Sequence, residues 1–481
     1  MITKNKKKCK RTNNNNIEGI RISGIEKTED VLTDRAGLLL FVKYLSQIGI
    51  YPLIERYFGS MRKSKKGIPI ENIFKQLFCF FVDGTSFSLL RFDEIKRDKG
   101  YIETIENNRE LMLSSHSAKR FFYSFSFVRI WLFRRLLQDL FIWRLTVEKP
   151  DIIILGMDTT VLDNNDAKKR EGVQGTYQKT RGFQPLQMNY GNCVIDAVFR
   201  GGKKHSNYGN TVIEAVSHIV KRIRKEYGED VPIIIRADAG FFDKKNFEAF
   251  ERMNIGYICG GRVYSDIKEK MSKVSSFEEY EKCDENGNCV VWEYKEFTDK
   301  RGNWNKERRA IYTRIPYNGK RQLVLDFAKE ERIIYTNLGT SEELNKLFID
   351  KGKEEYLNPD KIIETYHNRG NDELVNRYLK EFGTEKLPFK RFIPNAAFYY
   401  IMCVSFFLCE AFKKDVLLAN ERKEGTEPAN ISPTTVRRTF IDFAGRIVHT
   451  GRRIILKVTE WIWERINIPL LWHRCNNPVP I

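Results

Sequence analysis

The sequence lacks the features that mark membrane-spanning and secreted proteins. Its only candidate membrane span, residues 396–409, is shorter than the roughly 20 apolar residues that a bilayer requires, and Glu410 and Lys413 follow it. We therefore predict a buried helix there and no membrane partner. The N-terminal residues contain no apolar segment of the kind found in secretory signals.

Cysteine is sparse, and its spacing excludes the common zinc modules. The chain has 9 cysteines, an odd number, and no Cys-x-x-Cys pair, which indicates reduced thiols in a cytosolic protein. Cys283 and Cys289 flank the stretch DENGN. This pattern favours a hairpin turn with two incidental cysteines over a metal clip.

Acidic residues are outnumbered by basic ones. The 481 residues include 82 Lys and Arg against 63 Asp and Glu, a formal net charge of +19. This surplus favours a polyanionic partner, and DNA, RNA and an anionic membrane surface all qualify. Six basic residues among the first eleven, followed by four asparagines, predict a disordered basic arm over 1–30.

The remaining chain is long enough for about two to four structural units. Apolar residues at helical spacing predict a helical N-terminal region over 31–150; DNA binding by this region is implied by the family resemblance described below. From 151 the order of strands and helices predicts an α/β ribonuclease-H-like core, in two parts, 151–261 and 339–415. A run of hairpin-like strands predicts a β-rich insertion over 262–338. We also predict a helical C-terminal region over 416–481.

One short segment of the N-terminal region resembles the start of a DNA-reading helix. Ser114 or Ser115 is expected to cap a short helix that carries Lys119 and Arg120, as in a helix-turn-helix. An amphipathic helix that only packs on its neighbours explains the same pattern equally well.

Two aspartates end apolar runs that read as buried strands. Asp158 closes IIILGMD, and Asp238 closes PIIIRAD. Ligands of open α/β sheets bind beyond the carboxyl ends of the strands, so acids there are placed to hold a metal or a substrate. A single such aspartate is more often a turn former or a helix cap. Two of them predict a site.

The stretch YHNRGNDELVNRYLK, residues 366–380, gathers four polar groups on one predicted helix face. At about 100° per residue, Tyr366, Arg369, Glu373 and Lys380 fall within a narrow sector. Such a face suits an anionic, metal-bound ligand. The alternative is a solvated face with ion pairs between residues four apart.

Together these residues resemble a known family. The order Asp158, Asp238, Glu373, with the tyrosine-arginine-glutamate-lysine signature at 366, 369, 373 and 380, is similar to the DDE transposases of bacterial insertion sequences. The resemblance is to the cut-and-paste branch that carries a β-strand insertion before the glutamate. The stretches MDTT, GFQPLQ, VFRGGKKHSNYGN and RADAGF agree with it.

The resemblance implies a DNA transposase with a ribonuclease-H-like core. Asp158, Asp238 and Glu373 would be the catalytic ligands of two Mg²⁺ or Mn²⁺ ions, and Tyr366, Arg369 and Lys380 would contact DNA phosphates. The implied partners are double-stranded DNA, as terminal inverted repeats and as target, and a second copy in a dimeric DNA complex. The implied location is the cytoplasm, in association with the nucleoid.

In such enzymes the insertion presents an aromatic side chain that stacks on a flipped base. Trp292 and Trp304 are the candidates here. Trp292 alternates with apolar residues in a strand, a pattern typical of a core residue. Trp304 lies in the polar stretch KRGNWNKE and is expected to be exposed.

Two other functions remain open at this stage. One is a transposase-derived protein that binds DNA without cleaving it, although all three acids and both cations are present. The other is a phosphatase that uses Asp158 as a nucleophile. That class expects a second aspartate two positions later, where this chain has Thr160.

Overall fold

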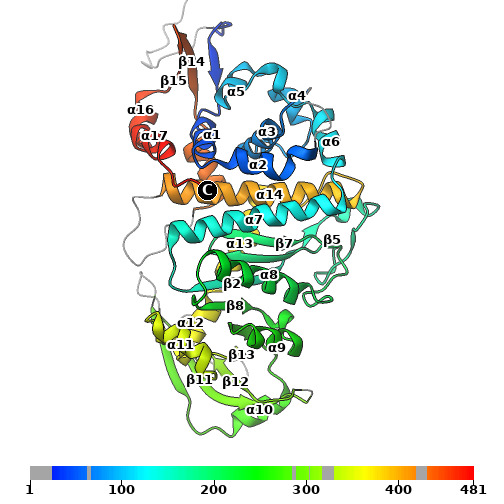
Figure 1. The fold of residues 1–481 in the computed structure, drawn as a ribbon, viewed down its shortest axis with the longest axis vertical. Helices are drawn as coiled ribbons and strands as arrows, with labels where there is room; N and C mark the ends of the chain where they lie inside the picture. The colour runs from blue at the N-terminus through cyan, green and yellow to red at the C-terminus, as the bar shows by residue number, and fades with distance from the viewer. Residues whose placement is uncertain (1–23, 62–66, 284–288, 303, 317–329, 419–430) are drawn as a thin grey trace, which may run out of the picture.

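The computed structural model describes residues 24–61, 67–283, 289–302, 304–316, 330–418 and 431–481. Helices occupy the upper part of the molecule in Figure 1, and a mixed sheet runs through the lower part. Two long helices, α7 (Phe127–Glu148) and α14 (Phe392–Phe412), cross the molecule between them. The predicted basic arm lies mostly outside the described residues.

One nine-stranded sheet organises the middle and lower parts. Its strand order is β10-β11-β12-β13-β9-β8-β2-β6-β7. β2, β8 and β9 run parallel, whereas β6 is antiparallel to β2 and β7 is antiparallel to β6. The strands at this end are β2 (Ile153–Thr159), β6 (Leu186–Tyr190), β7 (Cys193–Val198), β8 (Ile233–Ala237) and β9 (Gly256–Gly260).

This part of the sheet confirms the strands and helices predicted between 151 and 262. α8 (Thr211–Glu226) connects β7 to β8, and α9 (Lys244–Arg252) connects β8 to β9. The sequence pattern sufficed to predict these strands, because parallel strands that are buried on both faces appear in the sequence as continuous apolar runs. The resulting protein is mixed α/β, as predicted.

The predicted β-rich insertion contains strands, and they extend the same sheet. β13 (Glu331–Thr336) pairs antiparallel with β9, so that Ile334 lies opposite Gly260. β12 (Arg308–Arg314), β11 (Cys289–Asp299) and β10 (Glu278–Cys283) follow as an antiparallel series. α10 (Ser265–Ser272) precedes them. A further strand expected at 321–327 lies outside the described residues.

The N-terminal region is helical, as predicted, after a first short strand β1 (Val31–Thr33). Ser114 caps α6 through a capping box with Ser117, which confirms the expected start of that helix. The helices are α1 (Leu38–Gln47), α2 (Ile50–Phe58), α3 (Ile70–Asp83), α4 (Arg91–Ile95), α5 (Lys99–Thr104), α6 (Ser115–Tyr123) and α7.

The C-terminal region returns to the N-terminal one. β1 pairs with β14 (Gly445–Thr450), which in turn pairs with β15 (Arg453–Lys457). This region also contains α15 (Pro433–Val436), α16 (Glu460–Arg465) and α17 (Ile468–Asn476). It therefore contains two strands that the helical description of 416–481 did not include.

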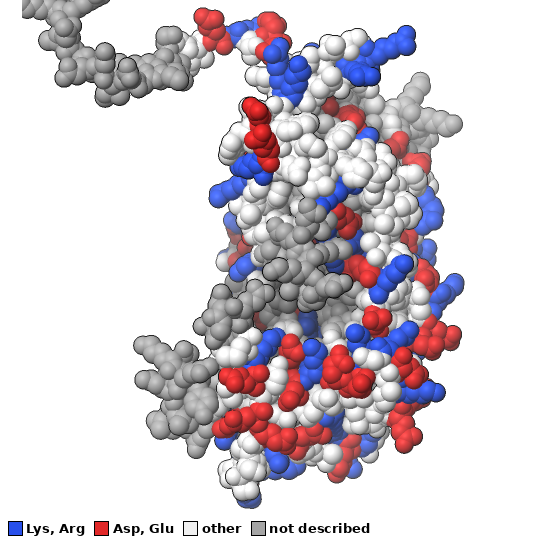
Figure 2. Space-filling view, turned by 90° about the vertical axis from the view of Figure 1, so that its left-hand side faces the viewer, with Lys and Arg blue, Asp and Glu red and all other residues white. Residues whose placement is uncertain are grey.

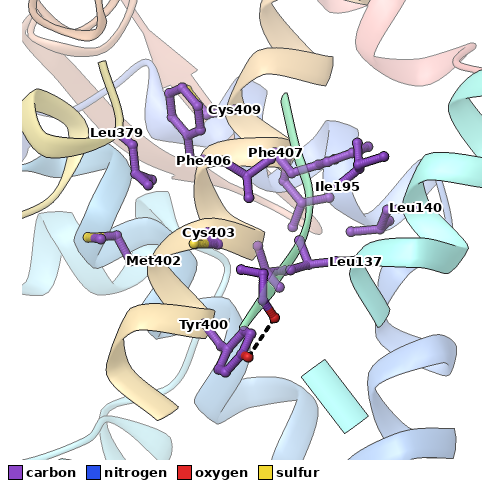
Figure 3. Close-up of a cluster of buried hydrophobic side chains, with 14 of the residues drawn as sticks. Leu137, Leu140, Ile195, Leu379, Tyr400, Met402, Cys403, Phe406, Phe407 and Cys409 are labelled. Atoms are coloured by element: carbon purple, nitrogen blue, oxygen red, sulfur yellow. Dashed lines mark hydrogen bonds between the residues drawn. The ribbon is translucent and has the colours of Figure 1, made fainter. Parts of the chain in front are cut away.

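The helix α14 forms the centre of the main hydrophobic core. It extends the predicted buried helix of 396–409, and it packs on α3, α7 and β7. The segment Phe392–Leu417 is long and apolar enough to span a membrane, yet 89% of its most apolar window is buried inside the protein. A helix that is apolar all round belongs in the core of a large protein. Figure 3 shows its side chains against Leu137, Leu140 and Ile195.

Tyr400 on α14 makes the one polar contact drawn in that cluster (Figure 3). Its hydroxyl donates to the carbonyl oxygen of Ala197 at 2.7 Å and accepts from the Phe199 amide at 3.3 Å, and all three groups are buried. We expect Tyr400→Phe to lower the free energy of unfolding by about 1–3 kcal/mol, because two buried backbone groups lose a partner. Urea unfolding measures this. The control Tyr123→Phe, on an exposed tyrosine, should change stability by less than about 0.5 kcal/mol; equal effects would contradict the prediction.

The two cysteines of the predicted hairpin are bonded to each other. Cys283 ends β10 and Cys289 begins β11, and they face each other in the ladder and form a disulfide. The expectation that all cysteines are free thiols is therefore wrong at this pair. The hairpin itself is confirmed, and its register explains the bond, since directly opposed residues bring their Cβ atoms close. Six other cysteines of the described residues are free.

Candidate active site

Asp158 and Asp238 lie side by side at the carboxyl ends of two neighbouring parallel strands. Met157 of β2 is in register with Ala237 of β8, and each aspartate is the next residue along. Adjacent parallel strands end at the same edge of a sheet, so the two carboxylates share that edge. The prediction that the topology brings these two acids together is therefore confirmed.

Each aspartate is oriented by a hydrogen bond to the backbone beside it. Oδ1 of Asp158 accepts from the Thr159 amide at 2.7 Å, and Oδ1 of Asp238 accepts from the Gly240 amide at 2.8 Å. The second oxygen of Asp158 accepts from Nδ2 of Asn376 at 2.6 Å. Asn376 belongs to α13 (Gly370–Phe382), the helix that carries Glu373.

Burial raises the pKa of Asp158 to about 7, and the neighbouring charge of Asp238 adds to the increase. A buried carboxylate beside another negative charge binds a proton more readily than an exposed one. A cation between them would favour the ionised forms instead, so that cation binding and proton release are linked at this edge of the sheet.

Arg369 links the sheet edge to Glu373. Its Nη1 lies 3.6 Å from Oδ2 of Asp238, and its Nη2 lies 2.7 Å from Oε1 of Glu373. The three acids Asp158, Asp238 and Glu373 do not each bring an oxygen within 4.8 Å of the other two. Asp238 and Glu373 lie on either side of the Arg369 guanidinium, and Glu373 itself is largely exposed.

The four signature residues do not lie on one continuous helix, so the predicted single face is wrong. α12 (Pro359–His367) ends before Arg369, and α13 begins after it. The carbonyl oxygen of Thr365 accepts from Nη1 of Arg236, and the Arg369 amide bonds to Tyr366 instead. Arg236 thus takes the acceptor that a continuous helix would give to residue 369.

Tyr366 and Lys380 consequently lie at different depths. Tyr366 is buried at the end of α12, and a Cβ at Gly260 would lie 2.4 Å from its hydroxyl. Lys380, near the end of α13, pairs with Glu385 at 3.0 Å, and among the described residues it forms no ion pair with any of the three acids. Of the signature residues, Arg369 and Glu373 contact each other directly.

A buried ion pair fastens α13 to the sheet beside the site. Arg236 of β8 bonds through Nε and Nη2 to both oxygens of Asp372, at 3.1 and 3.0 Å. Gly156 of β2 lies beneath that carboxylate, since a Cβ there would be 2.4 Å from Oδ1 of Asp372. Because Asp372 precedes Glu373 directly, this pair determines where the helix presents the glutamate.

Sequence reasoning did not identify Arg236, Asp372, Gly156 or Asn376. Two signals were available. A glycine within an apolar strand often marks a close approach of another group, and Asn376 lies three residues after Glu373, on the same side of a helix. Neither signal names the partner, which comes from another part of the chain.

Neither candidate tryptophan presents a free face for a base. Trp304 is 5% exposed and packs among Phe242, Phe247 and Tyr335, so the expectation that it is exposed is wrong. The prediction relied on the polar residues that flank Trp304 in the sequence. These neighbours do not reveal the aromatic side chains from β13 and α9 that enclose it in the fold. Trp292 is buried, as its strand pattern indicated, and stacks on Tyr280 and His367.

An exposed tyrosine lies near the acids instead. Tyr177 lies between β4 (Gln174–Gly175) and β5 (Arg181–Phe183), which pair in a small sheet with β3 (Leu162–Asp163). Partial burial raises its pKa, and the charges of Asp158, Asp238 and Glu373 all contribute. Sequence analysis did not select Tyr177, because nothing in its local pattern separates it from other loop tyrosines.

The match to a protein-family model agrees with the resemblance seen in the motifs. No curated protein sequence matches the chain. A piggyBac transposase, solved by cryo-EM in a synaptic complex with hairpin DNA, is similar at 12% identity over 86% of this chain and 92% of that one. The TM-score between the two structures is 0.27. The model of the family "Transposase DDE domain group 1" matches residues 24–468. The match spans nearly the whole chain, and the protein therefore belongs to the DDE transposase family.

Proposed function

We propose that this protein cleaves the ends of its own insertion sequence and joins them to target DNA by phosphoryl transfer that depends on two divalent ions. The observation that carries the proposal is the pairing of Asp158 and Asp238 at adjacent strand ends, with Glu373 joined to Asp238 through Arg369. Acids gathered at the carboxyl edge of a sheet suit a phosphate-bound cation.

The strand order supports a ribonuclease-H-like core within this proposal. β7, β6, β2, β8 and β9 are neighbours in that sequence, with β6 antiparallel to β2 and with β8 and β9 parallel to it. Three meandering strands followed by two helix-connected parallel strands give this order. The two aspartates then fall at its central strands.

The donor set fits divalent cations. Carboxylate oxygens are hard ligands of the kind that Mg²⁺ and Mn²⁺ prefer, and the raised pKa of Asp158, caused first by burial, indicates a place where added positive charge is stabilising. Asp158, Asp238 and Glu373 would hold the ions. When bound, two such ions supply Lewis acidity at the scissile phosphate.

The protein's own residues orient the site and bind the strand. Asn376 donates a hydrogen bond to one oxygen of Asp158 and so fixes the orientation of that carboxylate. Arg369 and Lys380 would bind phosphates, Arg369 through its planar guanidinium and Lys380 as a point charge. In the joining step a 3′-hydroxyl oxygen would form a new bond to phosphorus as the bond to the leaving 3′ oxygen breaks. The attacking hydroxyl would lose its proton to water, and the leaving oxygen would take up a proton from water to become a free 3′-hydroxyl.

The proposed partner is double-stranded DNA, first as the two ends and then as target. The net charge of +19 supports a polyanion. On the face in Figure 2, basic and acidic side chains intermingle over the lower part of the molecule, so the described residues of that part form no single basic patch. Pairing two ends requires at least two copies in the DNA complex.

The experiment uses a DNA fragment that carries the gene with its natural flanking sequence on both sides. With Mg²⁺ and the full chain, we expect nicks or breaks at two positions that bracket the gene, and none when EDTA replaces the cation. A gel resolves both cleavage and binding. A fragment that is retarded on the gel yet stays intact would identify a DNA-binding protein that does not cleave.

A further inference from the structure

Arg369 occupies the position between the acids of the site. Its guanidinium reaches Asp238 with one nitrogen and Glu373 with the other, at 3.6 and 2.7 Å. Its side chain is 22% exposed, whereas the side chains of Asp238 and Glu373 are 37% and 63% exposed. Arg369 therefore lies deeper than the two acids that it joins.

The surroundings of Arg369 are those of a bound cation. Burial opposes its charge, but Asp238, Glu373 and Asp158 together with Tyr366 raise its pKa above the ordinary value. The same three acids are the ones proposed to hold divalent ions. With the guanidinium among them, they do not come within 4.8 Å of one another as a set.

We propose that Arg369 is an internal counter-cation of Asp238 and Glu373 and competes with divalent ions for these two carboxylates. This inference rests on the proposed function, because it assumes that these acids bind metal. An arginine fork spans two carboxylates and always carries its charge. Divalent ions would therefore bind only when the guanidinium of Arg369 moves away from at least one of these two carboxylates.

Withdrawal gives Arg369 a second role. It precedes the first turn of α13 and is held there by the backbone, so the guanidinium can turn from the carboxylates to a phosphate nearby. Linkage then requires reciprocity: a DNA phosphate that takes Arg369 strengthens metal binding, and bound metal strengthens the phosphate contact by the same factor. The site would hold its ions most tightly when DNA is present.

The test measures Mn²⁺ binding to the full chain without DNA, by electron paramagnetic resonance of the free ion. We expect Arg369→Gln to bind Mn²⁺ roughly tenfold more tightly than the natural protein, since a competing positive charge is removed. The matched control is Lys380→Gln, which removes one positive charge from α13 at a position paired with Glu385. Its affinity should stay within about twofold of the natural protein.

The outcomes separate this inference from the proposed function. Unchanged or weaker Mn²⁺ binding by Arg369→Gln overturns the inference, as does equal tightening by Lys380→Gln, which would report net charge alone. If the natural protein shows no Mn²⁺ binding that is lost in Asp238→Asn, the proposed metal site fails, and the inference with it. Should Arg369→Gln not fold, Arg369→Lys replaces it: the shorter reach of a point charge predicts tighter binding by a smaller factor, and no tightening overturns the inference.

Discussion

Replacing Asp158, Asp238 or Glu373 singly by its amide is expected to lower the rate of DNA strand cleavage by about 100-fold or more. Each change keeps the size of the side chain and removes one negative oxygen from the proposed metal site. Binding to the DNA ends should persist, since it depends on basic residues elsewhere. Cleavage and gel retardation of the same flanked fragment measure the two effects separately.

Asp166→Asn is the matched control for these three variants. Asp166 is exposed, lies a few residues beyond Asp158 in the chain, and pairs at 3.8 Å with Lys386. Its amide variant should cleave at the natural rate. Full activity in one of the three site variants would remove that residue from the metal site, and full activity in all three would contradict the proposed chemistry.

The second large effect is expected on stability, at the buried pair beside the site. Arg236→Met should lower the free energy of unfolding by about 3–5 kcal/mol, because it leaves the carboxylate of Asp372 buried without its partner. The side chains of the pair are 11% and 5% exposed, so solvent screens them little. The shift of the urea midpoint, with its slope, measures the change.

Two further variants identify the cause of that loss. Lys273→Met breaks an ion pair with Glu269 whose side chains are 72% and 69% exposed, and it should cost less than about 1 kcal/mol. The double variant Arg236→Met with Asp372→Leu should recover much of the loss, because no unpaired charge remains. A cost at position 236 no larger than that at 273 would show that the pair does not fasten α13.

Much of the fold could be predicted from local patterns. The apolar runs ending in Asp158 and Asp238 are strands, the segment 396–409 is a buried helix, and Ser114 starts a helix. In each case the deciding information lies within a few residues, as an apolar period, a run length or a capping side chain. The acids at the strand ends follow from the same information.

The predictions failed where tertiary packing or strand register, and not local composition, determines the contacts of a residue. Trp304 is surrounded by polar neighbours in sequence and by aromatic rings in space. Cys283 and Cys289 are close in sequence, yet only the register of β10 and β11 makes them a bonded pair. Local composition contains neither fact.

The residues of this chain determined by themselves which acids it offers, at which strand ends they stand and to which family it belongs. Tertiary structure alone decided how those acids meet. Arg236 reaches across from β8 to take the Thr365 carbonyl and the Asp372 carboxylate, which divides the signature helix, and Arg369 then enters the space between Asp238 and Glu373. The physical reason is that a buried charge must find a partner, and folding supplies that partner from more than 100 residues away.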